Sequence, residues 1–326
     1  MPDPSRAPEA AAAPGRVADA VAGNWVDRHA PARARPYLRL SRADRPIGTW
    51  LLFLPCLWGL ALAAAAGGGF RPGDLWILAG CGMGAFLMRG AGCTWNDITD
   101  RDFDGRVART RSRPIPSGQV TVRQAAVWMV AQALAAAVIL FTFHPVAIAL
   151  GVGSLVLVAV YPFAKRFTWW PQLFLGLAFN WGVLVAYAAH AGQVGLPAVL
   201  LWLAGIVWTL FYDTIYAHQD REDDALIGVR STARLFGTQT RLWLRGFLVA
   251  AVLLATLAVV PALVQANAGW GAVLLALAGI WGFGAHLGWQ LVRLDIDDGA
   301  LCLTLFRSNR DAGLILALFL AAAALA

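Results

Sequence analysis

Charged side chains are scarce in this chain of 326 residues, and their scarcity excludes an ordinary soluble domain. Asp, Glu, Lys and Arg together make up 14% of the residues, whereas soluble domains carry about 25%. Hydrophobic residues make up 59%, and the mean hydropathy is +0.61. The composition therefore indicates an integral membrane protein whose partner is the lipid bilayer.

Cysteine is also scarce, and its four copies lie in or beside apolar stretches without forming a Cys-x-x-Cys pair: Cys56, Cys81, Cys93 and Cys302. We expect small buried helix residues, and neither a disulfide framework nor a thiolate metal site. The first 45 residues hold eight Arg but lack the apolar segment of a signal peptide. Residues 1–15 are expected to be disordered, and residues 16–40 to contain a short interfacial helix.

Long apolar runs are abundant, and they are too long and too rich in Ala and Leu for strands. A bilayer core of about 30 Å requires about 20 apolar residues per helix. Nine segments qualify, namely 46–66, 73–96, 122–142, 144–163, 170–190, 197–217, 243–263, 269–292 and a short last one at 311–326. The predicted fold is an all-α polytopic membrane domain of nine transmembrane helices over residues 41–326, preceded by a cytoplasmic extension over residues 1–40.

Basic residues alternate between the loops. Many Arg precede the first span, and more follow spans two, four, six and eight, the last group being Arg293, Arg307 and Arg310. The alternate loops contain only Arg71. Because Lys and Arg favour cytoplasmic loops, the pattern predicts a cytoplasmic N-terminus. It also accounts for the net charge of +7 without a nucleic-acid partner.

Acidic residues are concentrated in two short windows, which hold nine of the 19 Asp and Glu. The first window is 96–104 and the second is 213–224, each at the predicted cytoplasmic end of a span. On a continuous helix, residues four apart share a face. The expected rows are Asn96, Asp100 and Asp104, with Asp97 beside them, and Asp213, Asp220 and Asp224.

Carboxylates in such rows repel each other unless a cation compensates them. Mg²⁺ prefers hard oxygen ligands and is usually shared with substrate phosphates. A solvated acidic helix end is the alternative interpretation of one row. Two rows beside Arg-rich loops favour a clamp for a metal-bound diphosphate, whose charge would also be neutralised by Arg101, Arg221, Lys165 and Arg166.

Arg89 is the only basic residue deep within an expected span, because Arg123 and Arg245 fall among the first three residues of theirs. It lies seven residues before Asn96 and therefore on the same helical face. An intramembrane Arg is costly and marks a functional site by default, the alternative being an Arg that snorkels to the interface. We expect Arg89 to bind an anionic acceptor. Arg45, at the mouth of the first span, is the competing candidate.

Several segments resemble the signatures of the UbiA superfamily of intramembrane prenyltransferases. Residues 96–104 match its NDxxDxxxD pattern and are followed by Arg113-Pro114-Ile115-Pro116-Ser117-Gly118. The second signature is similar to Tyr212-Asp213 through Asp220-Arg221-Glu222-Asp223-Asp224, and a third to Tyr161-Pro162-Phe163-Ala164-Lys165-Arg166. The combination is most similar to members that prenylate 4-hydroxybenzoate in ubiquinone synthesis.

The resemblance implies nine helices around a central cavity that opens to lipid. It implies that Mg²⁺ on a polyprenyl diphosphate is held by Asp100, Asp104, Asp220 and Asp224, assisted by Asn96, Asp97 and Asp213. Arg101, Lys165 and Arg166 would grip the diphosphate, and Tyr161 would line the same pocket. The expected reaction transfers the polyprenyl group to the ring carbon ortho to the hydroxyl of 4-hydroxybenzoate, in a bacterial inner (plasma) membrane with the active site facing the cytoplasm.

Two other classes of function remain as alternatives. Another enzyme of the superfamily would use haem, a naphthoate, homogentisate or chlorophyllide as acceptor. A multi-span ion or metal transporter would also carry acidic rows, but transporters place ionisable groups near the bilayer midplane. The acids here lie at helix ends, beside large basic loops, which favours an enzyme.

Overall fold

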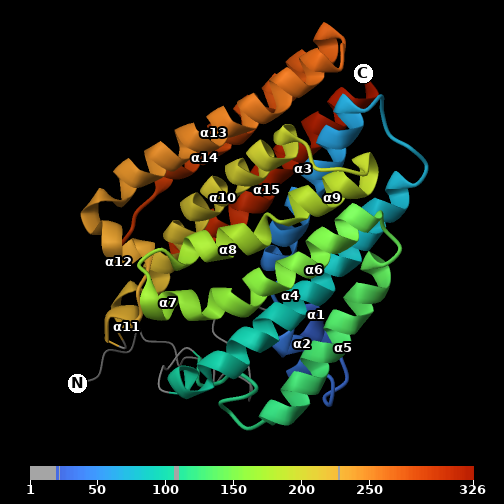
Figure 1. Cartoon of the computed structure of the whole chain (residues 1–326). Coiled ribbons are helices and arrows are strands. Elements are labelled where there is room, and N and C mark those ends of the chain that lie inside the picture. Colours follow the sequence, from blue (N-terminus) through green and yellow to red (C-terminus); the bar gives the residue numbers. More distant parts are fainter. Residues whose placement is uncertain (1–19, 22, 106–109, 227) are drawn as a thin grey trace. The chain divides into compact units, whose positions relative to one another are not determined.

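The computed structural model describes residues 20–21, 23–105, 110–226 and 228–326. The segment 1–15, which the sequence predicts to be disordered, lies outside these residues, as do the side chains of Asp220, Asp223 and Asp224. All regular elements in the described part are helical (Figure 1). The all-α prediction is thereby confirmed.

Within the described part of the chain, nine helical segments are long and apolar enough to cross a membrane, in agreement with the predicted number. Six are single helices: α3 (Ile47–Ala66), α4 (Asp74–Asp104), α5 (Val122–Leu140), α10 (Leu196–Ala217), α14 (Trp270–Arg293) and α15 (Gly299–Leu325). Three are composite: α6 (Pro145–Val160) with η1 (Tyr161–Phe163) and α7 (Ala164–Phe167), α8 (Pro171–Phe179) with α9 (Gly182–Ala191), and α12 (Thr232–Phe236) with η3 (Gly237–Gln239) and α13 (Thr240–Gln265). The predicted orientation of these spans stays a prediction.

The last span was predicted wrongly. It begins at Gly299 rather than near residue 311 and has 27 residues, so it is long enough to cross the bilayer without local thinning. Arg307 and Arg310 therefore lie inside α15 and not in a loop, and Arg241 and Arg245 likewise lie inside α13. Arg89 is consequently not the only basic residue within a span.

The N-terminal segment contains two short helices, α1 (Trp25–His29) and α2 (Arg35–Leu40), where one was predicted. Asn24 caps the first, because its side chain accepts a hydrogen bond from the backbone N–H of Asp27. Pro36, near the start of the second, has the backbone φ that a helix needs there.

The chain divides into two compact units. Unit 1 comprises Met1–Pro46 with Leu87–Leu134, and unit 2 comprises Ile47–Phe86 with Ala135–Ala326. Helix α4 contributes its first part to unit 2 and its acidic end to unit 1. The predicted division at residue 40 stays a prediction.

Unit 2 is built on a core of aromatic side chains. Helix α3 packs against α9 and α15, while α10 packs against α8 and α13. The rings of Trp58 and Trp208 lie 4.9 Å apart, and both are 5.9 Å from Phe283. The indole N–H of Trp208 donates to Asn309 Oδ1 at 2.9 Å, so these two buried polar side chains of the core are paired.

Unit 1 is held together by a small buried polar cluster. Ser41 Oγ donates to Gln132 Oε1 of α5 at 2.8 Å and accepts from Trp128 Nε1 at 2.8 Å. A Cβ atom at Gly90 of α4 would lie only 1.9 Å from Gln132 Oε1. Glycine at this position therefore allows α5 to approach α4 closely, which fixes the helix that carries the first acidic window.

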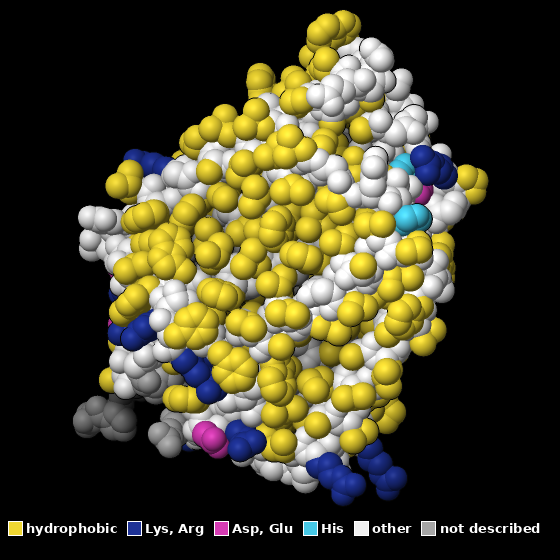
Figure 2. Space-filling model, viewed as in Figure 1, with side chains coloured by type: hydrophobic (Ala, Val, Ile, Leu, Met, Phe, Trp, Pro, Cys, Tyr) yellow, Lys and Arg dark blue, Asp and Glu magenta, His cyan; other side chains and the backbone are white. Residues whose placement is uncertain are grey.

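The surface agrees with a lipid environment. Figure 2 shows a face covered largely by hydrophobic side chains, with Lys and Arg mainly near its margins. In unit 2 the exposed apolar residues include Leu253 (56%) and Trp281 (68%). Exposed apolar residues in such numbers are expected where lipid, rather than water, surrounds the helices.

Candidate functional site

The first acidic window lies at the end of one uninterrupted helix. Helix α4 continues through Asp104, so the predicted row of Asn96, Asp100 and Asp104 on one helical face is confirmed. Asp97, Asp100 and Asp104 are buried, with exposed fractions of 0%, 1% and 8%, whereas Asp102 is exposed. Three buried carboxylates on two turns of helix require compensating charge.

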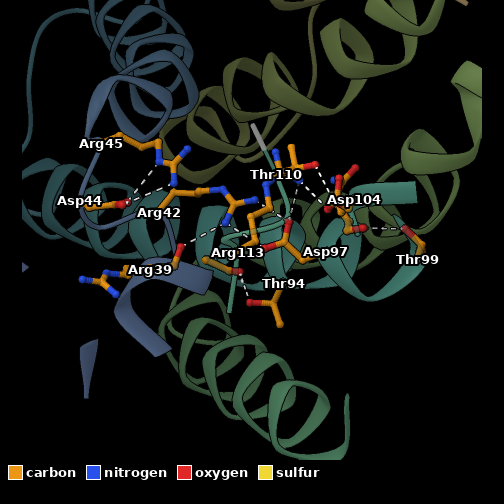
Figure 3. Close-up of polar contacts among 12 residues, drawn as sticks. Arg39, Arg42, Asp44, Arg45, Thr94, Asp97, Thr99, Asp104, Thr110 and Arg113 are labelled. Carbon is orange, nitrogen blue, oxygen red and sulfur yellow. Dashed lines mark hydrogen bonds and ion pairs between the residues drawn. The ribbon is translucent and has the colours of Figure 1, made fainter. Parts of the chain in front are cut away.

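Arg42 supplies part of that charge. Its Nη1 donates to Asp97 Oδ2 at 2.9 Å, and its Nη2 donates to Asp97 Oδ1 at 2.5 Å (Figure 3). The two side chains are 7% and 0% exposed. The pair is thus a bidentate ion pair inside the protein, which is the strongest form of this interaction.

Arg113 supplies further positive charge, next to Asp97 and Asp104. Its Nη1 donates to Asp104 Oδ2 at 2.7 Å and lies 3.4 Å from Asp97 Oδ1. Figure 3 shows its guanidinium between these two carboxylates. The loop that carries it is tied back to α4, because Thr110 Oγ1 donates to the backbone oxygen of Asp104 at 2.8 Å.

Arg42 reaches Asp97 because of how helix α2 ends. The backbone N–H of Ala43 donates to Leu38 O, and that of Arg42 donates to Arg39 O, both at 3.0 Å. These two bonds form a Schellman motif, which places Arg42 in the left-handed conformation at φ 56°. Glycine usually occupies this position, so an arginine here has a conformational cost that its ion pair offsets.

The two candidates for an acceptor-binding Arg differ in their surroundings. Arg45 is buried and donates through Nε and Nη2 to Asp44, at 3.2 and 3.4 Å. Arg89 lies on α4 two turns before Asn96, and its Nε is buried. Arg101, a predicted diphosphate ligand, is exposed beside Asp102.

The second acidic window is not one continuous α-helix, and the shared face expected for Asp213, Asp220 and Asp224 stays a prediction. Helix α10 ends at Ala217, residues His218–Asp220 form a 3₁₀ turn, and α11 (Arg221–Leu226) follows. Asp213 lies within α10 and is half-buried. The side chains of Asp220 and Asp224 lie outside the described part, so their metal-binding role stays a prediction.

His218 occupies the turn and is neutral at physiological pH. Burial, reinforced by the nearby Arg221 guanidinium, lowers its pKa to about 4, against a smaller opposing effect of Asp297. Its Nε2 lies 3.1 Å from Thr240 Oγ1, and Thr214 Oγ1 lies 2.7 Å from Thr232 Oγ1. These contacts with α12 and α13 hold the chain where α10 ends.

The remaining predicted ligands of unit 2 lie at helix ends. Arg221 pairs with Asp297 at 3.0 Å and is partly exposed. Tyr161 lies in η1, and Lys165 lies in α7, where both are half-buried. Arg166 is exposed, with its guanidinium 5.0 Å from the centre of the Phe163 ring.

Sequence reasoning missed Arg42 and Arg113. Arg42 precedes Asp97 by 55 residues, so helical spacing carries no signal for their contact. Arg113 belongs to the Arg-Pro segment after the first acidic window, and its closeness to that window was the available signal.

The residues of the first window fit a magnesium ion that is shared with a substrate. Asp100 and Asp104 present hard oxygen donors one helical turn apart. Among the described side chains, no group of three or more acidic, His or Cys residues converges on one point. This is compatible with Mg²⁺, which is usually held by one or two carboxylates together with substrate phosphates and water.

Comparison with known proteins identifies the family of the chain. The model of the UbiA prenyltransferase family matches residues 52–310. The chain is 47% identical over 313 residues to a rat protein named 4-hydroxybenzoate polyprenyltransferase, mitochondrial, covering 95% of this chain and 80% of the relative. A human protein of the same name is 48% identical over 290 residues, covering 88% and 74%.

A solved structure shares the fold. It is a UbiA homolog from Archaeoglobus fulgidus bound to GPP and Mg²⁺, with a TM-score of 0.65 and 19% identity, covering 88% of this chain and 98% of that one. At this identity the likeness establishes the arrangement of the helices alone.

Proposed function

Because the chain belongs to the UbiA prenyltransferase family, we propose that it transfers a polyprenyl group from polyprenyl diphosphate to 4-hydroxybenzoate. The new bond forms at the ring carbon ortho to the hydroxyl, and diphosphate leaves. The observation that carries the proposal is the 47% identity to a relative whose name states this activity, over 95% of the chain. Ubiquinone synthesis is the pathway that uses such a product.

Metal-assisted loss of diphosphate accounts for the acidic residues. Asp100 and Asp104 would hold Mg²⁺ from the first window, and Asp220 and Asp224 from the second. When bound, Mg²⁺ supplies positive charge that stabilises the departing diphosphate. This assignment is supported by the burial of Asp100 and Asp104 and by the chemistry of their oxygen donors.

Basic side chains complete the binding of the diphosphate. We assign this role to Arg101, Arg221, Lys165 and Arg166, and we assign Asn96, Asp213 and Tyr161 to substrate binding as well. Guanidinium and ammonium groups donate hydrogen bonds to phosphate oxygens, and they stabilise the charge that develops as the C–O bond breaks. Their exposed or half-buried state leaves their donors accessible to a ligand.

The acceptor carboxylate needs a cation of its own. We assign Arg89 to this role because a carboxylate that enters the membrane must be paired with a cation. Arg89 also precedes Asn96 by seven residues, which is roughly 10 Å along the helix axis. An aromatic ring fits between a carboxylate held there and an allylic carbon near Asp100. The hydroxyl of the ring activates the ortho carbon, which attacks the allylic carbon and then loses its proton.

The reaction is tested by offering purified enzyme a polyprenyl diphosphate, Mg²⁺ and several aromatic acids. We expect mass spectrometry to detect prenylated 4-hydroxybenzoate and one diphosphate released per product. Product only from a naphthoate, homogentisate or another acceptor would assign the chain to a different reaction of the family. Ion flux through vesicles without any prenylated product would favour a transporter.

We also propose that both acidic windows face the cytoplasm. Support comes from the arginines beside them. Single cysteines placed in loops 110–118 and 228–231 should react with an impermeant reagent only in broken cells, and labelling of intact cells would contradict the orientation. The bacterial plasma membrane stays a prediction, because the relatives described above are named as mitochondrial proteins.

A further inference from the structure

The buried carboxylates of the first acidic window have unequal surroundings. Both oxygens of Asp97 accept hydrogen bonds from Arg42, at 2.9 and 2.5 Å, and Oδ1 also lies 3.4 Å from Arg113. Asp104 instead accepts one short bond, 2.7 Å, from Arg113. Among the described residues, Asp97 is thus enclosed by two guanidinium groups, while the side chain of Asp104 accepts from Arg113 alone.

Asp97 is poorly suited to bind a metal. A Mg²⁺ ligand must bring an oxygen to about 2.0–2.1 Å from the ion, which here would place a dication beside two guanidinium groups on the same carboxylate. Arg42 is restrained beside Asp97, because its side chain is only 7% exposed and its backbone conformation is set by the hydrogen bonds at the end of α2. Separating this pair would leave a buried charge without its partner, which is strongly destabilising.

Arg113 is placed to exchange partners. It lies in a loop rather than in a helix, and its side chain is 12% exposed. If Asp104 binds another cation, the Arg113 guanidinium still lies 3.4 Å from Asp97 Oδ1, so its charge remains compensated. Its Nη1 donor then becomes available to an anion that arrives with that cation.

From these contacts we propose that Asp97 is a positioning residue and not a metal ligand. The guanidinium of Arg113 pairs with Asp104 before the metal binds, and Mg²⁺ then takes its place at Asp104. Asp97 keeps Arg113 in the site after this exchange. The proposal rests on the proposed function for the identity of the metal. It differs from the expectation, drawn from the family resemblance, that Asp97 assists in binding the ion. Arg113 becomes a further diphosphate ligand in this scheme.

The charges of the five groups are consistent with this exchange. Asp97, Asp100 and Asp104 carry three negative charges, and Arg42 and Arg113 carry two positive charges, so these five groups together have a net charge of one negative unit, which attracts a dication. Removing Arg113 raises that excess to two and removes the competitor for Asp104. Removing Asp97 together with Arg113 restores the excess to one.

The test measures Mn²⁺ binding, as a probe for Mg²⁺, by electron paramagnetic resonance of the free ion on the full chain in nanodiscs. Arg113→Gln should lower the Kd for Mn²⁺ by about tenfold, because a unit charge within a few ångströms of the ion is removed. Adding Asp97→Asn to Arg113→Gln should give a Kd no weaker than that of the wild type. Asp104→Asn should raise the Kd by about tenfold or more.

Arg39→Gln is the matched control. Arg39 also lies in unit 1, is 8% exposed and pairs with Asp27 at 2.9 Å. In the described part of the chain, no ion pair joins its side chain to any of the three carboxylates. Its variant should bind Mn²⁺ as the wild type does. An effect equal to that of Arg113→Gln would mean that general charge, and not displacement at Asp104, governs binding.

Two results would overturn the proposal. One is a Kd for Mn²⁺ that is unchanged or raised in Arg113→Gln. The other is a Kd for Mn²⁺ at least about tenfold higher in the Asp97→Asn, Arg113→Gln double variant than in the wild type, as expected if a metal ligand is lost. If that double variant fails to fold, Arg42→Gln with Asp97→Asn removes both charges of the buried pair, and a similar weakening there would equally identify Asp97 as a ligand.

These outcomes are separate from those of the proposed function. The titration contains neither prenyl diphosphate nor acceptor, so it does not depend on which acid is prenylated. If Asp104→Asn leaves Mn²⁺ binding unchanged, the metal site of the proposed function fails, whereas the results with Arg113 and Asp97 concern only the division of roles within that site.

Discussion

The first acidic window lies on one uninterrupted helix, whereas the second lies across the end of a helix. In the first, α4 carries three buried carboxylates that Arg42 and Arg113 compensate. In the second, α10 ends at Ala217, and a neutral His218 holds the turn before the remaining acids. Two acid-rich windows are thus built in two ways, one by regular helix geometry and one by tertiary contacts at a helix end.

The largest expected effect is on the metal-binding acids. Asp100→Ala and Asp220→Ala should each abolish turnover, a loss of about a hundredfold or more, because each removes a carboxylate that compensates the metal and its developing charge. Prenylated product per enzyme is the measurement, with membrane extraction as a check of insertion. Asp102→Ala, at an exposed acid in the same window, is the matched control. Full activity in either test variant would show that one window is enough.

The next effect concerns Arg89, which precedes the first window and has no counterpart among the predicted ligands of the second. Arg89→Ala should raise the KM for 4-hydroxybenzoate and leave that for prenyl diphosphate nearly unchanged. Loss of a buried charged hydrogen bond costs about 2–5 kcal/mol, which is about thirtyfold or more in KM. Steady-state kinetics with each substrate varied in turn provide the measurement. If Arg45→Ala and not Arg89→Ala shows this pattern, Arg45 binds the acceptor.

A smaller effect is expected from the packing beneath the first window. Gly90→Ala should destabilise the protein by about 1–3 kcal/mol, because its Cβ would meet Gln132 Oε1 at 1.9 Å. Gly84→Ala, in the same helix, has no atom within 4 Å of its Cβ and should be stabilising by about 0.5–1 kcal/mol. Thermal midpoints in detergent distinguish the two. Equal shifts would mean that the approach of α5 does not depend on Gly90.

The smallest effect is expected at the exposed ion pair of the second window. The side chains of Arg221 and Asp297 are 33% and 72% exposed, so Asp297→Asn should change the free energy of unfolding by about 0–1 kcal/mol. Thermal unfolding, compared with Asp97→Asn at the buried pair, provides the measurement. A loss as large as that at Asp97 would show that the two windows depend equally on ion pairs.

The helix pattern was predictable for most of the chain. Apolar length identified nine spans, and spacing of four residues placed Asn96, Asp100 and Asp104 on one face, as α4 shows. The start of α15 was missed because Arg307, Asn309 and Arg310 look like loop residues. Asn309 is accommodated because it bonds to Gln290 and Trp208, and these partners are distant in the sequence.

The sequence by itself determined the membrane environment, the number of spans and the positions of the acidic windows along the chain, because hydropathy and helical spacing are local properties. Only the tertiary structure decided that α10 stops at Ala217 and that Arg42 pairs with Asp97 across 55 residues. Local spacing carries no signal for such contacts. They form because a buried charge or polar group must find a partner wherever the fold brings one within reach.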